Sequence, residues 1–275
     1  MDLQHKHWAL ICIAILVAAF VVLVIWYSFG SQTVMAPDRG NATSTPSAAT
    51  TSPAAPAHIT DHATYYDIDL TYPSVTPLTS VSVAANARAV ATMQAAMQST
   101  ADQFIKDGNF AHLTHDDVQM MGLDQRKEDL SSEYKTYTGS RTVSYVFEIY
   151  EDTLGAHPNA FYRTFTFDTK TGAALDLSDL FTPGLNYLGT LSAIASQQLP
   201  AILAEREQVS VSEVDTDYMH SGISPEPDSF QSWYIKGGVL TIVFPPYQVG
   251  PYALGTIELP IPLSKVSASL KSDYR

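Results

Sequence analysis

Two short stretches of the sequence hold the residue types best suited to contacting a ligand. In the first, His157 and Asn159 lie shortly after Glu151 and Asp152. A histidine beside an amide and carboxylates could hydrogen-bond a sugar or join a metal site, but a metal needs three or four convergent ligands. This loop supplies at most two, and a histidine that only shapes the loop is the alternative. The loop consists of Gly155, Ala156, His157, Pro158 and Asn159.

The second stretch, PPYQVGPYALG at positions 245–255, combines aromatic and conformationally restricted residues. Tyrosines have few rotamers and large faces, so Tyr247 and Tyr252 suit contacts with sugars or proteins. Pro251 constrains the backbone beside them, and Gly255 permits a tight turn. The alternative is a loop that simply covers the core. We predict that His157, Asn159, Tyr247 and Tyr252 form the ligand-binding surface.

Sequence signatures of catalysis are lacking. The chain contains no G-x-S-x-G, no G-x-x-x-x-G-K-[ST] and no G-x-G-x-x-G. His112 and His115 are three residues apart in HLTHDD, but no third ligand stands near them, so the metal signal is weak. Cys12 is the single cysteine, which excludes an internal disulfide. We therefore predict no catalytic residue, no metal and no cofactor, while a dispersed enzyme site stays open as an alternative.

Hydrophobic periodicity defines the elements that must position the two loops. Period-two alternation predicts strands, and apolar residues at three- and four-residue steps predict helices. A proline inside the second helix, Pro200, should kink or split it. The order of strands and helices predicts an α+β fold with a mostly antiparallel sheet and two main packing helices. The expected strands are 65–72, 142–150, 161–167, 230–236, 239–244 and 256–261, and the expected helices are 84–106 and the segment that follows Thr182-Pro183.

A long apolar segment precedes this domain. Residues Trp8 to Tyr27 are twenty consecutive apolar or aromatic residues, which is the length that spans a bilayer as a helix. We predict a transmembrane helix over residues 8–29, with the short stub 1–7 in the cytoplasm because it contains Lys6. The alternative is a signal peptide cleaved after Ala36. Residues 30–62, rich in Ser, Thr, Ala and Pro, are expected to form a disordered linker.

The formal net charge is −13, and the charges up to Arg39 cancel, so all of it belongs to the expected extracytoplasmic part. Such a domain repels nucleic acid and anionic lipid surfaces, so we expect no nucleic-acid partner. It would attract a basic protein or a cationic glycan. The alternative is that the charge only keeps the domain soluble.

Four groups of residues form motifs: Gly155, Ala156, His157 and Asn159; Asp168, Thr171 and Gly172; Asp179-Leu180-Phe181; and Phe244, Tyr247, Val249, Pro251, Tyr252, Ala253 and Gly255. Together these motifs resemble a bacterial domain of unknown function. This domain forms the C-terminal part of the lysozyme-responsive anti-sigma factor of the sigma-V system (RsiV) and accompanies some exported peptidoglycan deacetylases. The resemblance divides the exported region into an N-terminal part (63–140), an RsiV-like C-terminal part (141–266) and a tail (267–275).

The resemblance implies a binding module of the bacterial cell envelope. It would be a single-pass membrane protein that recognises peptidoglycan glycan or a basic, lysozyme-like protein outside the cytoplasm. The seven-residue stub is too short to hold a sigma factor, so we expect the recognition part without the anti-sigma function. A cell-wall hydrolase or deacetylase and a structural envelope protein without a ligand are the alternatives.

Overall fold

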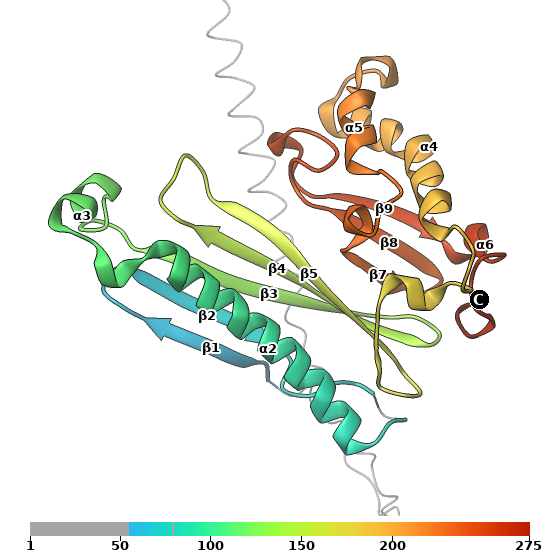
Figure 1. Cartoon of the computed structure of the whole chain (residues 1–275), viewed down its shortest axis with the longest axis horizontal. Coiled ribbons are helices and arrows are strands. Elements are labelled where there is room, and N and C mark those ends of the chain that lie inside the picture. Colours follow the sequence, from blue (N-terminus) through green and yellow to red (C-terminus); the bar gives the residue numbers. More distant parts are fainter. Residues whose placement is uncertain (1–54, 79) are drawn as a thin grey trace, which may run out of the picture. The chain divides into compact units, whose positions relative to one another are not determined.

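The computed structural model describes residues 55–78 and 80–275. Its first layer is a six-stranded sheet in the order β1-β2-β3-β4-β5-β6 (Figure 1). All neighbouring strands are antiparallel except β2 and β3, which are parallel. The strands are β1 (Ala57–His62), β2 (Tyr66–Tyr72), β3 (Glu128–Thr138), β4 (Thr142–Asp152), β5 (Asn159–Asp168) and β6 (Ala174–Leu175).

Helix α2 (Val83–Gly108) crosses over between β2 and β3 and covers one face of this sheet (Figure 1). A crossover of this kind is what a parallel strand pair requires. The helix begins at Ser82, whose side chain accepts a hydrogen bond from Ala85 N, and ends at Asn109 in the left-handed conformation. Its predicted apolar stripe is confirmed: Met93, Met97, Ala101 and Phe104 are buried against Ile68, Leu70, Phe147 and Ile149.

The second layer is a three-stranded antiparallel sheet with its own core. The strands are β7 (Trp233–Lys236), β8 (Val239–Phe244) and β9 (Ile257–Pro262). Gly237 and Gly238 both have positive φ angles and form the predicted two-residue turn between β7 and β8. Helix α4 (Tyr187–Glu207) buries Leu191, Ala195, Leu199 and Leu203 in the core of this layer, together with Ile242 and Leu259.

Strand β7 docks on the face of the large sheet that α2 leaves uncovered. The backbone N–H of Trp233 donates to Thr164 Oγ1 at 3.0 Å, and that of Ile235 donates to Ser144 Oγ at 3.1 Å. The Tyr234 ring stacks on Tyr137 with centroids 4.6 Å apart. Hydroxyl groups of the large sheet thus accept hydrogen bonds from N–H groups on the outer edge of β7, which would otherwise have no strand partner.

The remaining short elements connect these layers. Their bounds are η1 (Phe110–His112), α3 (His115–Met121), η2 (Leu177–Leu180), η3 (Val211–Glu213), α5 (Thr216–Gly222), η4 (Pro227–Phe230), η5 (Tyr252–Leu254), α6 (Leu263–Val266) and η6 (Ser272–Tyr274).

The α+β class is confirmed, but several details of the prediction are wrong. The six-stranded sheet is mixed, and β3 was not predicted because its sequence is largely polar. Residues 57–62 belong to β1 rather than to the linker 30–62. A boundary between residues 140 and 141 would cut the β3–β4 hairpin, whereas the change of layer comes after β6.

The second helix also differs from the prediction. It begins at Tyr187 with Asn186 as the N-cap, not at Thr182-Pro183, because Asn186 Oδ1 accepts from Gly189 N at 2.9 Å. Pro200 lies inside α4 without splitting it. The helix tolerates the backbone hydrogen bond lost at Pro200 because its apolar residues are buried both before and after this proline in the sequence.

The predicted transmembrane helix over residues 8–29 and most of the linker lie outside the described residues. Within residues 55–78 and 80–275, no helix is long and apolar enough to cross a membrane.

Candidate functional site

The two predicted loops meet in space although they are far apart in the sequence. The rings of His157 and Tyr252 stack with centroids 4.0 Å apart and an interplanar angle of 24°. The Tyr252 hydroxyl donates to the carbonyl of Pro158, 94 residues earlier in the chain. The same carbonyl lies 3.0 Å from His157 Nδ1, so the tautomer protonated at Nδ1 would donate to it. These contacts fasten the β4–β5 loop to η5.

Tyr247 extends this aromatic contact towards solvent. Its ring centroid lies 5.4 Å from that of Tyr252, and 57% of the residue is exposed. Its φ angle of 70° is uncommon for a bulky residue and is held by the Tyr218 hydroxyl, which donates to the Tyr247 carbonyl. We call His157, Tyr252, Tyr247 and Tyr218 the aromatic ridge.

The other predicted residues shape the ridge or lie beside it. Asn159 is the first residue of β5, exposed and opposite Glu151 in the ladder, so it lies in the sheet rather than in the loop. Pro251 is the N-cap of η5, and Gly255 leaves this turn with a φ angle of 64° that favours glycine. Gly155 and Ala156 are exposed in the β4–β5 loop, and Pro158 is half-buried under Tyr252.

An open groove of about 560 Å³ lies on one side of the ridge, where the two layers meet. It is formed by β4, β5, the end of α4 and the segment before β9. Burial raises the pKa of Tyr162 to about 12, helped by the charges of Glu148 and Glu258, so this phenol stays protonated. We call it the polar groove; it is lined by Glu148, Ala160, Tyr162, Arg206, Pro246, Tyr252, Ala253, Gly255, Thr256 and Glu258.

The polar groove continues onto the uncovered face of the large sheet. A second hollow of about 510 Å³ shares Glu148 and Ala160 with it and reaches Asp69 and Thr71 on β2. On its floor Glu133 and Glu148 stand directly opposite each other on β3 and β4. Like charges at such positions are unfavourable in a sheet, and both side chains are exposed, so a cation from solvent can reach them.

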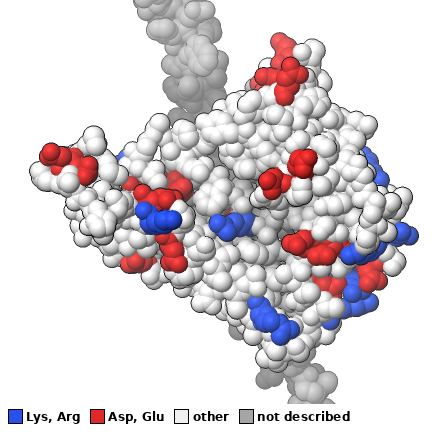
Figure 2. Space-filling model, in the orientation of Figure 1, with Lys and Arg blue, Asp and Glu red and all other residues white. Residues whose placement is uncertain are grey.

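A more apolar groove of about 440 Å³ lies on the other side of the ridge. Its walls include Leu203, Val214 and Val249, and its rim carries Glu207, Glu213 and Asp215. On the face drawn in Figure 2, acidic and basic side chains form small scattered groups separated by uncharged surface. Among the described residues, this face therefore carries no broad patch of one charge (Figure 2).

Within the described ranges, the histidines outside the ridge do not form a common cluster. His112 lies in η1 and His115 begins α3. His58 and His62 on β1 pair with Asp69 and Asp67 of β2 at 2.7 and 2.9 Å. In the part of the chain that the structure describes, no group of three or more His, Cys, Asp or Glu side chains is arranged to hold a metal ion.

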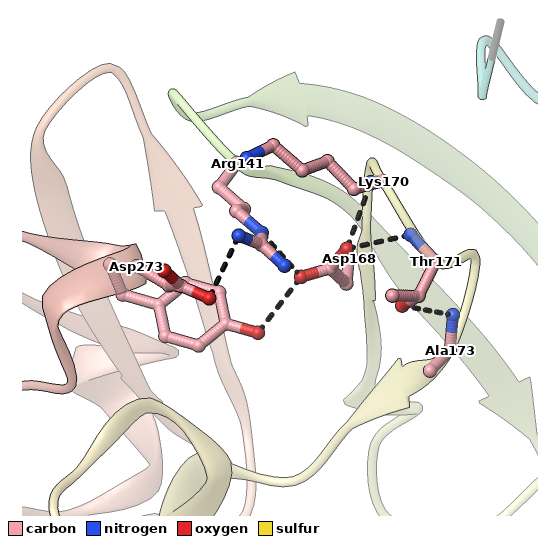
Figure 3. A network of polar contacts seen from close by, with 7 residues as sticks. Arg141, Asp168, Lys170, Thr171, Ala173 and Asp273 are labelled. Atoms are coloured by element: carbon pink, nitrogen blue, oxygen red, sulfur yellow. Dashed lines mark hydrogen bonds and ion pairs between the residues drawn. The ribbon is translucent and has the colours of Figure 1, made fainter. Parts of the chain in front are cut away.

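The turn from Asp168 to Gly172, which contributes to the resemblance seen in the sequence, has a structural role (Figure 3). Asp168 accepts hydrogen bonds from Arg141 Nε at 2.7 Å and from the Tyr274 hydroxyl at 3.0 Å, and also from the backbone N–H groups of Lys170 and Thr171. Arg141 in addition pairs with Asp273 at 2.8 Å. This network ties the C-terminal residues to the ends of β4 and β5.

Sequence reasoning named three residues of the ridge, His157, Tyr247 and Tyr252, but neither Tyr218 nor the polar groove. Glu148, Arg206 and Glu258 come from β4, α4 and β9, and no spacing in the sequence relates them. Glu148 does not interrupt the apolar alternation of β4, because its side chain points to the face opposite α2. Its sequence context therefore does not mark it as a site residue. Only the packing of the second layer on this face shows that the three side chains share a groove.

Comparison with known proteins assigns the second layer to a family. Residues 178–264 match the family described as "Protein of unknown function (DUF3298)", so a DUF3298 domain is present in the C-terminal part of the chain. This range begins just after β6 and ends in α6, and so coincides with the second layer. The loop that carries His157 precedes it.

One relative with a described activity is similar to part of the chain. The peptidoglycan-N-acetylmuramic acid deacetylase PdaC of Bacillus subtilis (strain 168) is 28% identical over 150 residues, which is 54% of this chain and 31% of that protein. The chain thus spans less than a third of the length of this relative.

Two solved structures share the fold. A DUF3298 family member from Bacteroides fragilis superposes with a TM-score of 0.53 at 18% identity, over 80% of this chain and 93% of the other. A DUF3298 family protein from Pseudomonas aeruginosa PAO1 gives 0.50 at 14% identity, over 81% and 97%. At these identities the likeness concerns the fold, and it extends beyond the DUF3298 range to the first layer.

Proposed function

We propose that this protein is a membrane-anchored binding module of the bacterial cell envelope that recognises peptidoglycan outside the cytoplasm. One observation carries the proposal: the stacked rings of His157 and Tyr252 continue into an exposed Tyr247 directly beside the polar groove. The similarity to a peptidoglycan deacetylase supports the same class of ligand. The anchor over residues 8–29, with a cytoplasmic N-terminus, follows from the sequence and belongs to the proposal.

The ridge and groove suit a carbohydrate polymer that carries polar substituents. Aromatic faces cover the apolar faces of sugar rings at little cost in side-chain entropy. The groove adds a few polar groups of both charge signs, which fix orientation. Tyr218 and the Pro158 carbonyl hold the ridge in place before a ligand arrives, so little binding energy is spent on ordering it.

Co-sedimentation with purified peptidoglycan sacculi tests this function. The full chain, solubilised in a mild detergent, should be retained by sacculi, and Tyr247→Ala should lower retention because it removes the most exposed ring of the ridge. Met120→Ala is a matched control, since Met120 is 80% exposed on α3 outside the ridge. A folded protein that sacculi do not retain would rule the proposal out.

The same incubation distinguishes the alternatives. Release of acetate or of soluble muropeptides would support a deacetylase or hydrolase instead. A lysozyme-like protein is the second candidate ligand, as the resemblance to the sigma-V anti-sigma factor implies. The apolar groove rimmed by Glu207, Glu213 and Asp215 favours a basic protein surface. Retention on immobilised lysozyme, weakened by salt, would support it.

The proposed anchoring is tested separately in cells. The protein should fractionate with membranes, and a protease added outside the membrane should degrade the domain while leaving an N-terminal tag protected. A tag that the protease removes together with the domain would contradict the proposed orientation.

A further inference from the structure

We infer that the polar groove binds the peptide part of peptidoglycan, through the free carboxylate and the free ammonium group of a short stem peptide. This inference rests on the proposed function and specifies which part of the polymer the groove recognises. It depends on the two kinds of charge that the groove brings together. Within the described residues, none of these charged side chains is in an ion pair, and their internal hydrogen bonds are to neutral groups.

Arg206 supplies the positive charge. It lies in the last turn of α4, and its Nη1 atom lies 3.5 Å from the Leu254 carbonyl, which directs the guanidinium towards the groove. The ion pairs of the described residues involve Asp67, Asp69, Asp168 and Asp273, and none includes Arg206. Its remaining donors are therefore available for a carboxylate, which a guanidinium can bind through two parallel hydrogen bonds.

Glu148 on β4 and Glu258 on β9 supply the negative charge. Glu258 accepts a hydrogen bond from the Tyr234 hydroxyl at 3.2 Å, which leaves its second oxygen for a ligand. Glu148 lies directly opposite Glu133 on the neighbouring strand β3. Neither glutamate is in an ion pair within the described ranges. An ammonium group bound here would relieve the repulsion between these two carboxylates.

Charges of both signs in one groove restrict the chemistry of the ligand. A neutral oligosaccharide could hydrogen-bond these groups but would neutralise neither charge, and a polycation would be repelled by Arg206. A short peptide with a free carboxylate and a free ammonium group satisfies both. The volume of about 560 Å³ lies in the range of ordinary ligand pockets. The hollow beyond Glu148, which reaches Asp69, leaves room for the chain to continue.

Isothermal titration of the full chain in detergent tests this inference. The probes are the stem peptide L-Ala-γ-D-Glu-meso-diaminopimelate, the same peptide with amidated carboxylates, the same peptide with acetylated amines, and chitotetraose. The free peptide should bind, and each blocked form should bind roughly tenfold or more weakly, as expected for a lost hydrogen bond to a charged group. Chitotetraose should not compete with the peptide.

Variants locate the binding within the groove. Arg206→Gln should bind the free peptide roughly tenfold more weakly than the wild type does. This variant should bind the free and the carboxylate-amidated peptides equally well. Glu258→Gln should reduce the discrimination against the acetylated form. Arg88→Gln on the exposed side of α2 is the matched control and should bind like the wild type.

The outcomes separate this inference from the proposed function. If sacculi retain the protein but the free peptide does not bind, or if Arg206→Gln binds it like the wild type, the inference is overturned and the proposed function survives. If neither sacculi nor any probe binds, both fail. Equal binding of the blocked and free peptides would also overturn the inference, whatever the stability of the variants.

Discussion

At the scale of single residues, Asp168 is the most constrained polar group of the fold. It is 2% exposed and accepts hydrogen bonds from two side chains and two backbone N–H groups. Gly172 closes the same turn with a φ angle of 71°, and a Cβ atom there would lie 2.7 Å from that of Ala85 in α2. The sequence motif around Asp168 is thus explained by folding and not by ligand binding.

Replacing Asp168 by asparagine should destabilise the protein by about 2–3 kcal/mol, because Arg141 loses its buried partner. Urea unfolding followed by circular dichroism measures the change. Asp273→Asn is the control: Asp273 also pairs with Arg141, but its side chain is 57% exposed, so the unfolding midpoint should hardly move. Equal effects of the two substitutions would contradict the role given to Asp168.

The same network predicts a loss of stability in acid. Burial by itself would raise the pKa of Asp168, but hydrogen bonds from Thr171, Arg141, Lys170 and Tyr274 lower it to about 2. A carboxylate with a depressed pKa stabilises the fold above its unfolded pKa of about 3.9, and that contribution disappears as the pH falls towards 2. The stability advantage of the wild type over Asp168→Asn should therefore shrink between pH 4 and pH 2. An advantage that stays constant over this range would contradict the assignment.

At the scale of elements, the sequence predicted secondary structure most accurately where one face of a helix or strand is buried. Alternation in β2 and β4 and the apolar stripe of α2 each reflect a single core, and all three were predicted within a few residues. Strand β3 was missed because its core-facing positions include Glu128 and Ser132, so no apolar alternation identifies it. Its parallel pairing with β2 depends on the crossover of α2, which no local pattern contains.

The docking of β7 on the large sheet is a second feature that sequence could not provide, and it yields a prediction. Ser144 is fully buried; its Oγ atom accepts from Ile235 N and lies 2.9 Å from Thr166 Oγ1. Ser144→Ala should leave both groups unpaired and lower the free energy of unfolding by about 1–3 kcal/mol. Ser140→Ala, at an exposed position near the β3–β4 turn, should change it little. Urea titration of both variants measures these changes in stability. An unchanged stability of Ser144→Ala would mean that other contacts hold β7 on the large sheet.

At the scale of the whole molecule, the candidate site is a product of two layers. The aromatic ridge joins a loop of the first layer to a turn of the second, and the polar groove adds Glu148 from one layer and Arg206 and Glu258 from the other. The sequence predicted the two loops, since their composition is unusual, but it could not predict that they touch. The DUF3298 match covers the second layer alone, so the described site depends on residues on both sides of that boundary.

The most direct test of the central claim is a titration of the full chain with a soluble disaccharide-peptide monomer released from peptidoglycan. We expect one saturable site, weakened roughly tenfold or more by Tyr247→Ala and unaffected by Met120→Ala. Folded wild-type protein that shows no saturable binding, or that binds the monomer equally well after Tyr247→Ala, would contradict the proposal that the aromatic ridge recognises the cell wall.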